Sequence, residues 1–113
     1  MFDFLKKKQE PIQQPIQQPV QVDNNLNGIK AEKNDESEEA IRLYEQNVAA
    51  RFDGSHPYKR LAIIYRKQKR YDDEVRVLEA AVDVFSKLKR QDASDKLKYF
   101  KDRLAKAKEL QRR

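Results

Sequence analysis

Apolar residues recur every three or four positions from residue 36 onward, and this spacing limits the fold more than any other feature. Side chains with this spacing share one face of an α-helix, so each such stretch predicts a helix with one buried side. No stretch alternates between apolar and polar residues for long enough to predict a β-strand. Short connections make consecutive helices antiparallel. The sequence therefore predicts an all-α fold with about four helices, over residues 36–52, from 57 to a turn at 69–70, 71–87 and 92–110.

Residues with strong preferences at helix ends set the expected boundaries. Asp35 is expected to cap the first helix, with Glu38 three residues later completing a capping box. Gly54 is expected to end that helix in the left-handed conformation. Pro57 suits the first position of the second helix, because its φ is fixed and it has no N–H to satisfy. Three successive acids fit the first turn of the third helix, where the helix dipole favours them: Asp72, Asp73 and Glu74.

The first 35 residues differ in composition and are expected to form a disordered Gln/Pro-rich arm. Prolines 11, 15 and 19 recur at every fourth position among glutamines, and they block helix formation. Residues 23–35 are polar and lack periodicity. The simplest interpretation is a spacer, and a docking peptide for a proline-binding domain is the alternative. The expected domains are thus the arm, residues 1–35, and a helical domain, residues 36–113.

The chain begins with the sequence MFDFLKKK, which permits two interpretations. It is either an unimportant chain start or a short anchor that touches a membrane surface or a partner. Its three apolar residues precede the lysines, whereas a secretory signal has a longer apolar region after its basic residues. No apolar run approaches the ~20 residues of a membrane-spanning helix. We therefore expect a cytoplasmic protein without stable membrane insertion.

The composition argues against most enzyme classes. Without cysteine, disulfides, cysteine-based zinc sites and thiol catalysis are excluded. The single histidine, His56, leaves little room for a metal site or a catalytic triad, and it is expected to be a solvated or helix-capping residue. Two glycines are too few for a phosphate-cradling loop. The expectation is a protein with no enzymatic activity, no cofactor and no bound metal.

Aromatic, large and small residues are spaced in a characteristic way over residues 58–85. The pattern consists of Tyr58, Leu61, Ala62, Tyr65, Tyr71, Leu78 and Ala81. With it, the segment resembles a tetratricopeptide repeat, a pair of antiparallel helices about 34 residues long. The resemblance covers about residues 38–110 and implies helical hairpins stacked as in an α-solenoid. In that family, small residues let two helices approach closely, and aromatic rings fill the space between them.

The resemblance is partial on both sides of this repeat. Residues 39–48 look like the second helix of a preceding, truncated repeat, with Ala40 and Tyr44 at its small and large positions. The last expected helix would be a solvating cap or the first helix of a following unit. The family usually has a small residue where Glu74 stands and a glycine where Lys69 stands. A glutamate between two helices needs a basic partner or a path to water.

Tetratricopeptide domains typically bind peptides on a concave face lined by the first helix of each pair. The resemblance places the contact positions at Lys59, Ile63, Arg66 and Lys67. Because three of the four are basic, it implies a basic groove for a protein partner or an acidic peptide. The alternative is that these are ordinary solvated residues of an amphipathic helix.

Two other functions stay open. The chain has a net charge of +6, and residues 86–113 carry 11 basic and four acidic residues, so this stretch could bind the phosphates of RNA or DNA. Against this, its basic residues are spread around the expected helix, and no nucleic-acid-binding signature is present. A repeat array normally needs about three units for stability, so the chain could also be a self-associating structural module.

Overall fold

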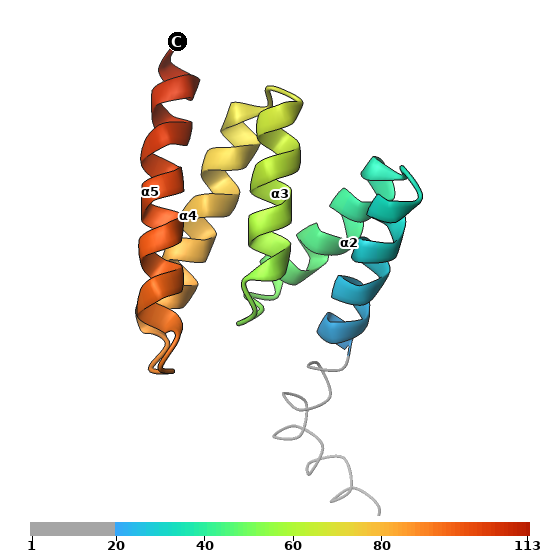
Figure 1. Cartoon of the computed structure of the whole chain (residues 1–113), viewed down its shortest axis with the longest axis horizontal. Coiled ribbons are helices and arrows are strands. Elements are labelled where there is room, and N and C mark those ends of the chain that lie inside the picture. Colours follow the sequence, from blue (N-terminus) through green and yellow to red (C-terminus); the bar gives the residue numbers. More distant parts are fainter. Residues whose placement is uncertain (1–19) are drawn as a thin grey trace, which may run out of the picture.

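The computed structural model describes residues 20–113, and every regular element within that range is an α-helix. The all-α class predicted from the sequence is therefore confirmed. The helices are a first helix over residues 20–33, then α2 (Ser37–Ala49), α3 (His56–Lys67), α4 (Tyr71–Lys87) and α5 (Ala93–Arg112). Figure 1 shows α3 between the first two helices on one side and α5 on the other. The bounds of α4 are those expected, and α5 begins one residue after Asp92, which is its N-cap.

The helix over residues 20–33 corrects the expectation of a disordered arm through residue 35. Its buried side carries Gln21, Gly28 and Ala31, whereas Val22 and Leu26 are 45% and 57% exposed. Because small and polar side chains face inward and aliphatic ones outward, the helix leaves no apolar stripe in the sequence. The described part of the chain thus has five helices instead of four. The prolines of the arm and the MFDFLKKK segment lie outside the described residues.

Three helices end through a residue with a left-handed backbone. Asp35, Arg51 and Lys69 have φ values of 60°, 56° and 61°. In each case two backbone N–H groups reach back to close the last turn, as in a Schellman motif. At Lys69, for example, the next residue, Arg70, donates to the carbonyl of Tyr65 at 2.8 Å. The lysine therefore has the conformation for which glycine is the usual residue.

Two expected boundaries of α2 were wrong. Gly54 does not end this helix: it ends at Ala49, and the left-handed position falls at Arg51. Asp35 does not cap its start, because that residue belongs to the turn that closes the preceding helix. The N-cap is Glu36, which makes no side-chain capping hydrogen bond. Both errors have the same cause. Asp35 and Arg51 occupy the left-handed positions of these turns, whereas glycine is the residue that usually marks such a position.

The first four helices form two hairpins built on the same plan. The first hairpin consists of the helix over residues 20–33 and α2, and the second of α3 and α4. Each is closed by a three-residue turn, 34–36 or 68–70, and Lys69 follows Asp35 by 34 positions (69 − 35 = 34). At the same interval, Gly28 corresponds to Ala62, and both are buried where two helices meet. The structure thus contains a repeat whose first copy begins before residue 36.

Aromatic rings hold the second hairpin against α5. Tyr58, Phe85 and Phe100 are at most 1% exposed, and their ring centroids lie 5.5–6.2 Å apart. Both pairs that include Tyr58 meet edge to face, a favourable arrangement for aromatic rings. Each ring comes from a different helix, so this cluster fixes α3, α4 and α5 together.

The first hairpin is packed with more polar groups. Asn47 of α2 is fully buried, and its side-chain amide donates to the backbone carbonyl of Gln21 at 2.8 Å. Asn24 in turn donates to Asn47 at 3.3 Å. The equivalent of Asn47 in the second hairpin is the fully buried Ala81. At this position of the first hairpin, hydrogen bonds therefore take the place of an apolar contact.

Candidate functional site

The four residues predicted to contact a partner lie on α3. Lys59, Ile63, Arg66 and Lys67 are spaced by four, three and one, so they share one side of this helix. Their surroundings nevertheless divide them into two pairs. Ile63 and Lys67 lie toward the first hairpin, whereas the side chains of Lys59 and Arg66 reach toward α5.

Ile63 and Lys67 line a hollow of about 210 Å³ between α3 and the end of the first hairpin. Both signs of charge line it, because Glu32 and Asp35 lie opposite Arg60 and Lys67. The remaining lining residues are Ser37, Ile64 and Gln68. The hollow therefore combines an aliphatic part with balanced charges, and it is less basic than the sequence predicted.

An ion pair fixes one wall of this hollow. The guanidinium of Arg60 binds both carboxylate oxygens of Glu32, with a closest distance of 2.7 Å, and the hydroxyl of Tyr44 donates to Glu32 at 2.7 Å. Burial raises the pKa of Glu32, but the hydrogen bonds from Arg60 and Tyr44 outweigh it and hold the pKa below its ordinary value. The carboxylate thus joins all three helices around it and stays charged.

His56 lies beside this ion pair, at the start of α3. Its ring meets Tyr44 edge to face at 5.8 Å, and its Nε2 is 3.5 Å from the Tyr44 hydroxyl oxygen. Burial lowers the pKa of His56; the carboxylate of Glu32 opposes this shift, and the charges of Arg60 and Lys59 add to it. The half-buried imidazole is therefore neutral at pH 7 and belongs to the packing between the two hairpins.

Lys59 and Arg66 have contacts with α5 and α4. The Lys59 ammonium lies 4.9 Å from the centroid of the Tyr99 ring, a cation–π contact. Arg66 donates to the carboxylate of Glu74 at 2.8 Å and to the backbone carbonyl of Arg103 at 3.3 Å. Arg66 is therefore held by an internal carboxylate, and of the three predicted cations Lys59 and Lys67 are the ones without an ion pair within the described residues.

Glu74 has the basic partner that a glutamate between two helices needs. It is fully buried, and Arg103 of α5 lies 3.8 Å away, on the same carboxylate oxygen that Arg66 binds. The two acids before it point elsewhere, since Asp72 accepts from Gln111 and Asp73 pairs with Arg70 and Arg76. In the described part of the chain, no group of three His, Cys, Asp or Glu side chains is arranged to hold a metal ion.

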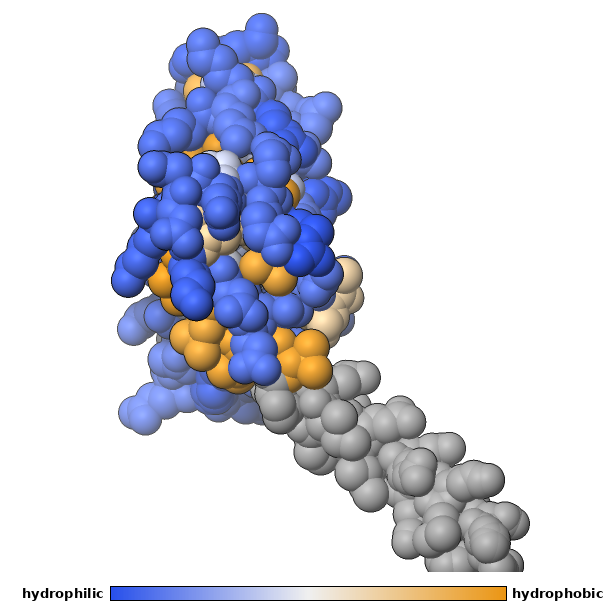
Figure 2. Space-filling view, turned by 90° about the vertical axis from the view of Figure 1, so that its right-hand side faces the viewer, coloured by the Kyte–Doolittle hydropathy of each residue, from blue (hydrophilic) through white to orange (hydrophobic). Residues whose placement is uncertain are grey.

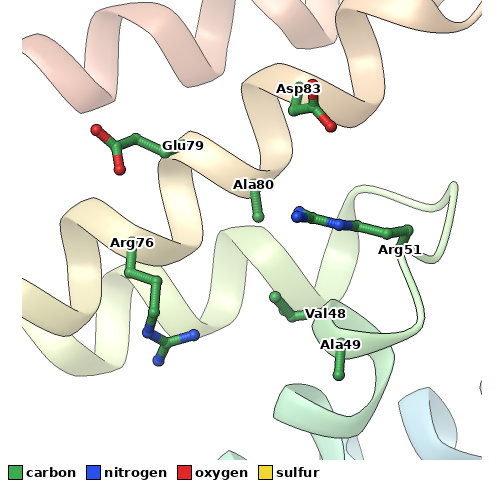
Figure 3. A pocket seen from close by; sticks show the side chains of 7 residues that line it. All are labelled: Val48, Ala49, Arg51, Arg76, Glu79, Ala80 and Asp83. Atoms are coloured by element: carbon green, nitrogen blue, oxygen red, sulfur yellow. The ribbon is translucent and has the colours of Figure 1, made fainter.

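A second hollow, of about 410 Å³, lies between the end of α2 and α4. Figure 3 shows Val48, Ala49 and Ala80 as its apolar part, with the Arg51 side chain extending across it toward α4. Arg76, Glu79 and Asp83 complete the rim. None of the predicted contact residues lines it, and its charges are mixed, so it adds no support to the basic groove.

Several basic residues of α5 are paired with acidic ones. Lys98 pairs with Asp102 at 2.8 Å and Lys106 with Glu109 at 3.5 Å along the helix, while Lys108 reaches Glu79 of α4 at 3.8 Å. Such alternation of charge is typical of a solvated helix face. Binding of nucleic acid by this segment stays a prediction that rests on its excess of basic over acidic residues.

Sequence reasoning missed Glu32 because it placed this residue in a disordered arm, and it assigned Asp35 to a helix cap instead of to the hollow. The signal that could have found them is the interval of 34 residues, which pairs Gly28 with Ala62 and Asp35 with Lys69.

No helix in the described range is long and apolar enough to cross a membrane. Comparison of the chain with protein-family models, with curated proteins and with solved structures finds no match.

Proposed function

We propose that this chain is a tetratricopeptide-like interaction module that binds a protein or an acidic peptide on the α3 side of its hairpins. One observation carries the proposal: two consecutive hairpins have the same turn at an interval of 34 residues. That interval is the length of a tetratricopeptide repeat. The buried small residues Gly28 and Ala62 fall at its position of closest helix approach.

The charges on α3 support an anionic ligand, although fewer of them are free than the sequence suggested. Lys67 is exposed, and Lys59 is half-buried against an aromatic ring. Ile63 lies between them on the helix and adds an apolar contact. An extended peptide with a carboxylate near an apolar side chain is the ligand that this combination fits best.

The experiment selects peptides from a random library displayed on phage, with the full-length chain immobilised. We expect acidic peptides to be enriched, and their binding to be lost in the Lys59→Glu/Lys67→Glu variant. A matched variant, Lys89→Glu/Lys101→Glu, changes the net charge equally at exposed residues elsewhere and should bind like the wild type. Equal binding to all three proteins, or no enrichment, would refute the proposal.

Arg66 is left out of these substitutions for a structural reason. Because its guanidinium neutralises the buried Glu74, replacing it would disturb the fold as well as any binding. Far-ultraviolet circular dichroism of both double variants checks that their helices remain intact.

A further inference from the structure

The outer end of the first hairpin carries an open groove. It measures about 260 Å³ and runs between the helix over residues 20–33 and α2. We call it the end groove; its lining residues are Asn27, Lys30, Ala31, Asn34, Glu36, Glu39, Arg42 and Leu43. Figure 2 looks onto the side of the molecule that carries the first hairpin, where apolar residues show between hydrophilic ones. The exposed large apolar residues of this hairpin lie outside the end groove: Val20, Val22 and Leu26. Leu43 and Ala31 are 7% and 4% exposed and form its apolar floor.

The same groove exists on the second hairpin, where it is filled. Adding 34 to Ala31, Arg42 and Leu43 gives Tyr65, Arg76 and Val77, which occupy the equivalent places on α3 and α4. Here α2 packs against them. Its Glu45 accepts a hydrogen bond from Tyr65 and two from Arg76, at 3.1 and 2.6 Å.

The helix that fills the second groove has a simple pattern on its inner side. Ile41 and Val48 are 8% and 5% exposed and belong to the main core, and Glu45 lies between them. The glutamate thus has an aliphatic residue four positions before it and another three positions after it. This pattern describes what such a groove accepts.

The end groove repeats the charged part of that arrangement. Arg42 pairs with Glu39 at 2.6 Å, as Arg76 pairs with Asp73 at 3.3 Å, both over three residues of one helix. Arg76 then binds Glu45 as well, whereas Arg42 has Glu39 as its single carboxylate partner in the described range. The two arginine side chains are exposed to a similar degree, so the difference between them lies in the second carboxylate. A carboxylate in the place of Glu45 is therefore the missing member of this set.

We propose that the end groove binds an amphipathic helix of another protein, with an acidic residue for Arg42 and aliphatic residues four before and three after it. This surface is distinct from the peptide-binding side of α3. The chain's own α2 and α4 are poor occupants from a second copy, because they already bury their apolar sides in their own hairpins. The exposed aliphatic residues of the helix over residues 20–33 do not have the required spacing around an acidic residue. Ala31, smaller than Tyr65, leaves space for a larger side chain than α2 presents.

The probe for the test is the α2 sequence itself, SEEAIRLYEQNVA, labelled with fluorescein and stapled between positions 39 and 43 to hold it helical. Fluorescence anisotropy with the full-length chain should show saturable binding. Arg42→Glu should weaken it at least about tenfold, since it replaces attraction with repulsion. A probe with Glu45→Arg should then prefer the Arg42→Glu protein to the wild type.

Two control proteins make the result specific. Lys59→Glu/Lys67→Glu changes the α3 side and should bind the probe like the wild type, which separates this test from that of the proposed function. Arg76→Glu tests whether the probe instead takes the place of the chain's own α2, which Arg76 binds through Glu45. No saturable binding, equal binding to the Arg42→Glu protein, or loss of binding in Arg76→Glu alone would each overturn the proposal.

Discussion

Gly28 lies so close to Tyr44 that no larger residue fits in its place. A Cβ atom added to Gly28 would lie 2.4 Å from Cε1 of the Tyr44 ring. The ring is fully buried, and its hydroxyl is held by Glu32, so it has little freedom to move. This contact sets the separation of the two helices in the first hairpin.

Replacing Gly28 with alanine should therefore destabilise the protein, although alanine favours the helix. Forced overpacking of a well-packed site costs about 1–3 kcal/mol, more than the ~1 kcal/mol gained in helix propensity. Urea unfolding followed by circular dichroism measures the difference. Asn27→Ala, at an exposed position of the same helix, is the control and should not lower stability. A Gly28→Ala protein as stable as the wild type would contradict the packing described here.

The free energy of unfolding should fall when one member of the Arg66–Glu74 pair is removed. Arg66→Met leaves the buried Glu74 with Arg103 at 3.8 Å as its remaining cation, and loss of a partner from a buried pair costs about 3–5 kcal/mol. The double variant Arg66→Met/Glu74→Gln should recover part of this loss, because the fully buried carboxylate is replaced by a neutral amide. Chemical unfolding of both proteins tests the expectation, with Lys98→Met as an exposed control. The expectation fails if the single and double variants are equally stable.

Glycine at the left-handed positions should stabilise the fold. A non-glycine residue in this conformation costs about 1–2 kcal/mol. Substitution by glycine removes this cost, but part of the gain in stability is lost because glycine makes the unfolded chain more flexible. Lys69→Gly should thus add about 0.5–1 kcal/mol to the free energy of unfolding. Gln68→Gly, one residue earlier at a φ of −85°, should not stabilise. Equal effects of the two substitutions on the thermal midpoint would count against the assigned turn.

Stability should fall on acidification in two stages. The pKa of His56 is lowered in the folded protein, so the unfolded chain binds the proton more readily, and stability declines as the pH falls below about 6.5. The pKa of Glu32 is also lowered, so its contribution is present above about pH 4.3 and is lost as the pH falls toward the folded value. His56→Gln should flatten the first stage and Glu32→Gln the second, in urea midpoints measured from pH 8 to 3.5. Unchanged profiles would argue against both assignments.

The sequence was most informative where apolar periodicity and burial agree. The third expected helix was correct at both ends, because its aliphatic stripe faces the core and acids fill its first turn. The helix over residues 20–33 was missed because its inward side is built from Gly28, Ala31 and polar groups, so its pattern is reversed. The helix end at Arg51 carried no glycine and therefore no local signal, whereas the turn at 69–70 was expected from the sequence.

The candidate site was only partly accessible to sequence reasoning. The need of Glu74 for a cation followed from its position, but the choice of Arg66 depends on how α3 and α4 face each other. For the same reason, the sequence counted Arg66 among the free cations of the groove. The acids opposite Lys67 come from a segment whose helix was not foreseen.

The hollow beside Ile63 and Lys67 and the end groove both depend on the helix over residues 20–33 being docked on α2 and α3. Amide hydrogen exchange of the full-length chain at neutral pH tests this most directly, because it reports on each backbone hydrogen bond. We expect the amides of residues 25–33 to be protected at least about a hundredfold, close to those of α3. Exchange at the rate of an unstructured peptide over these residues, with α3 and α4 protected, would contradict the account.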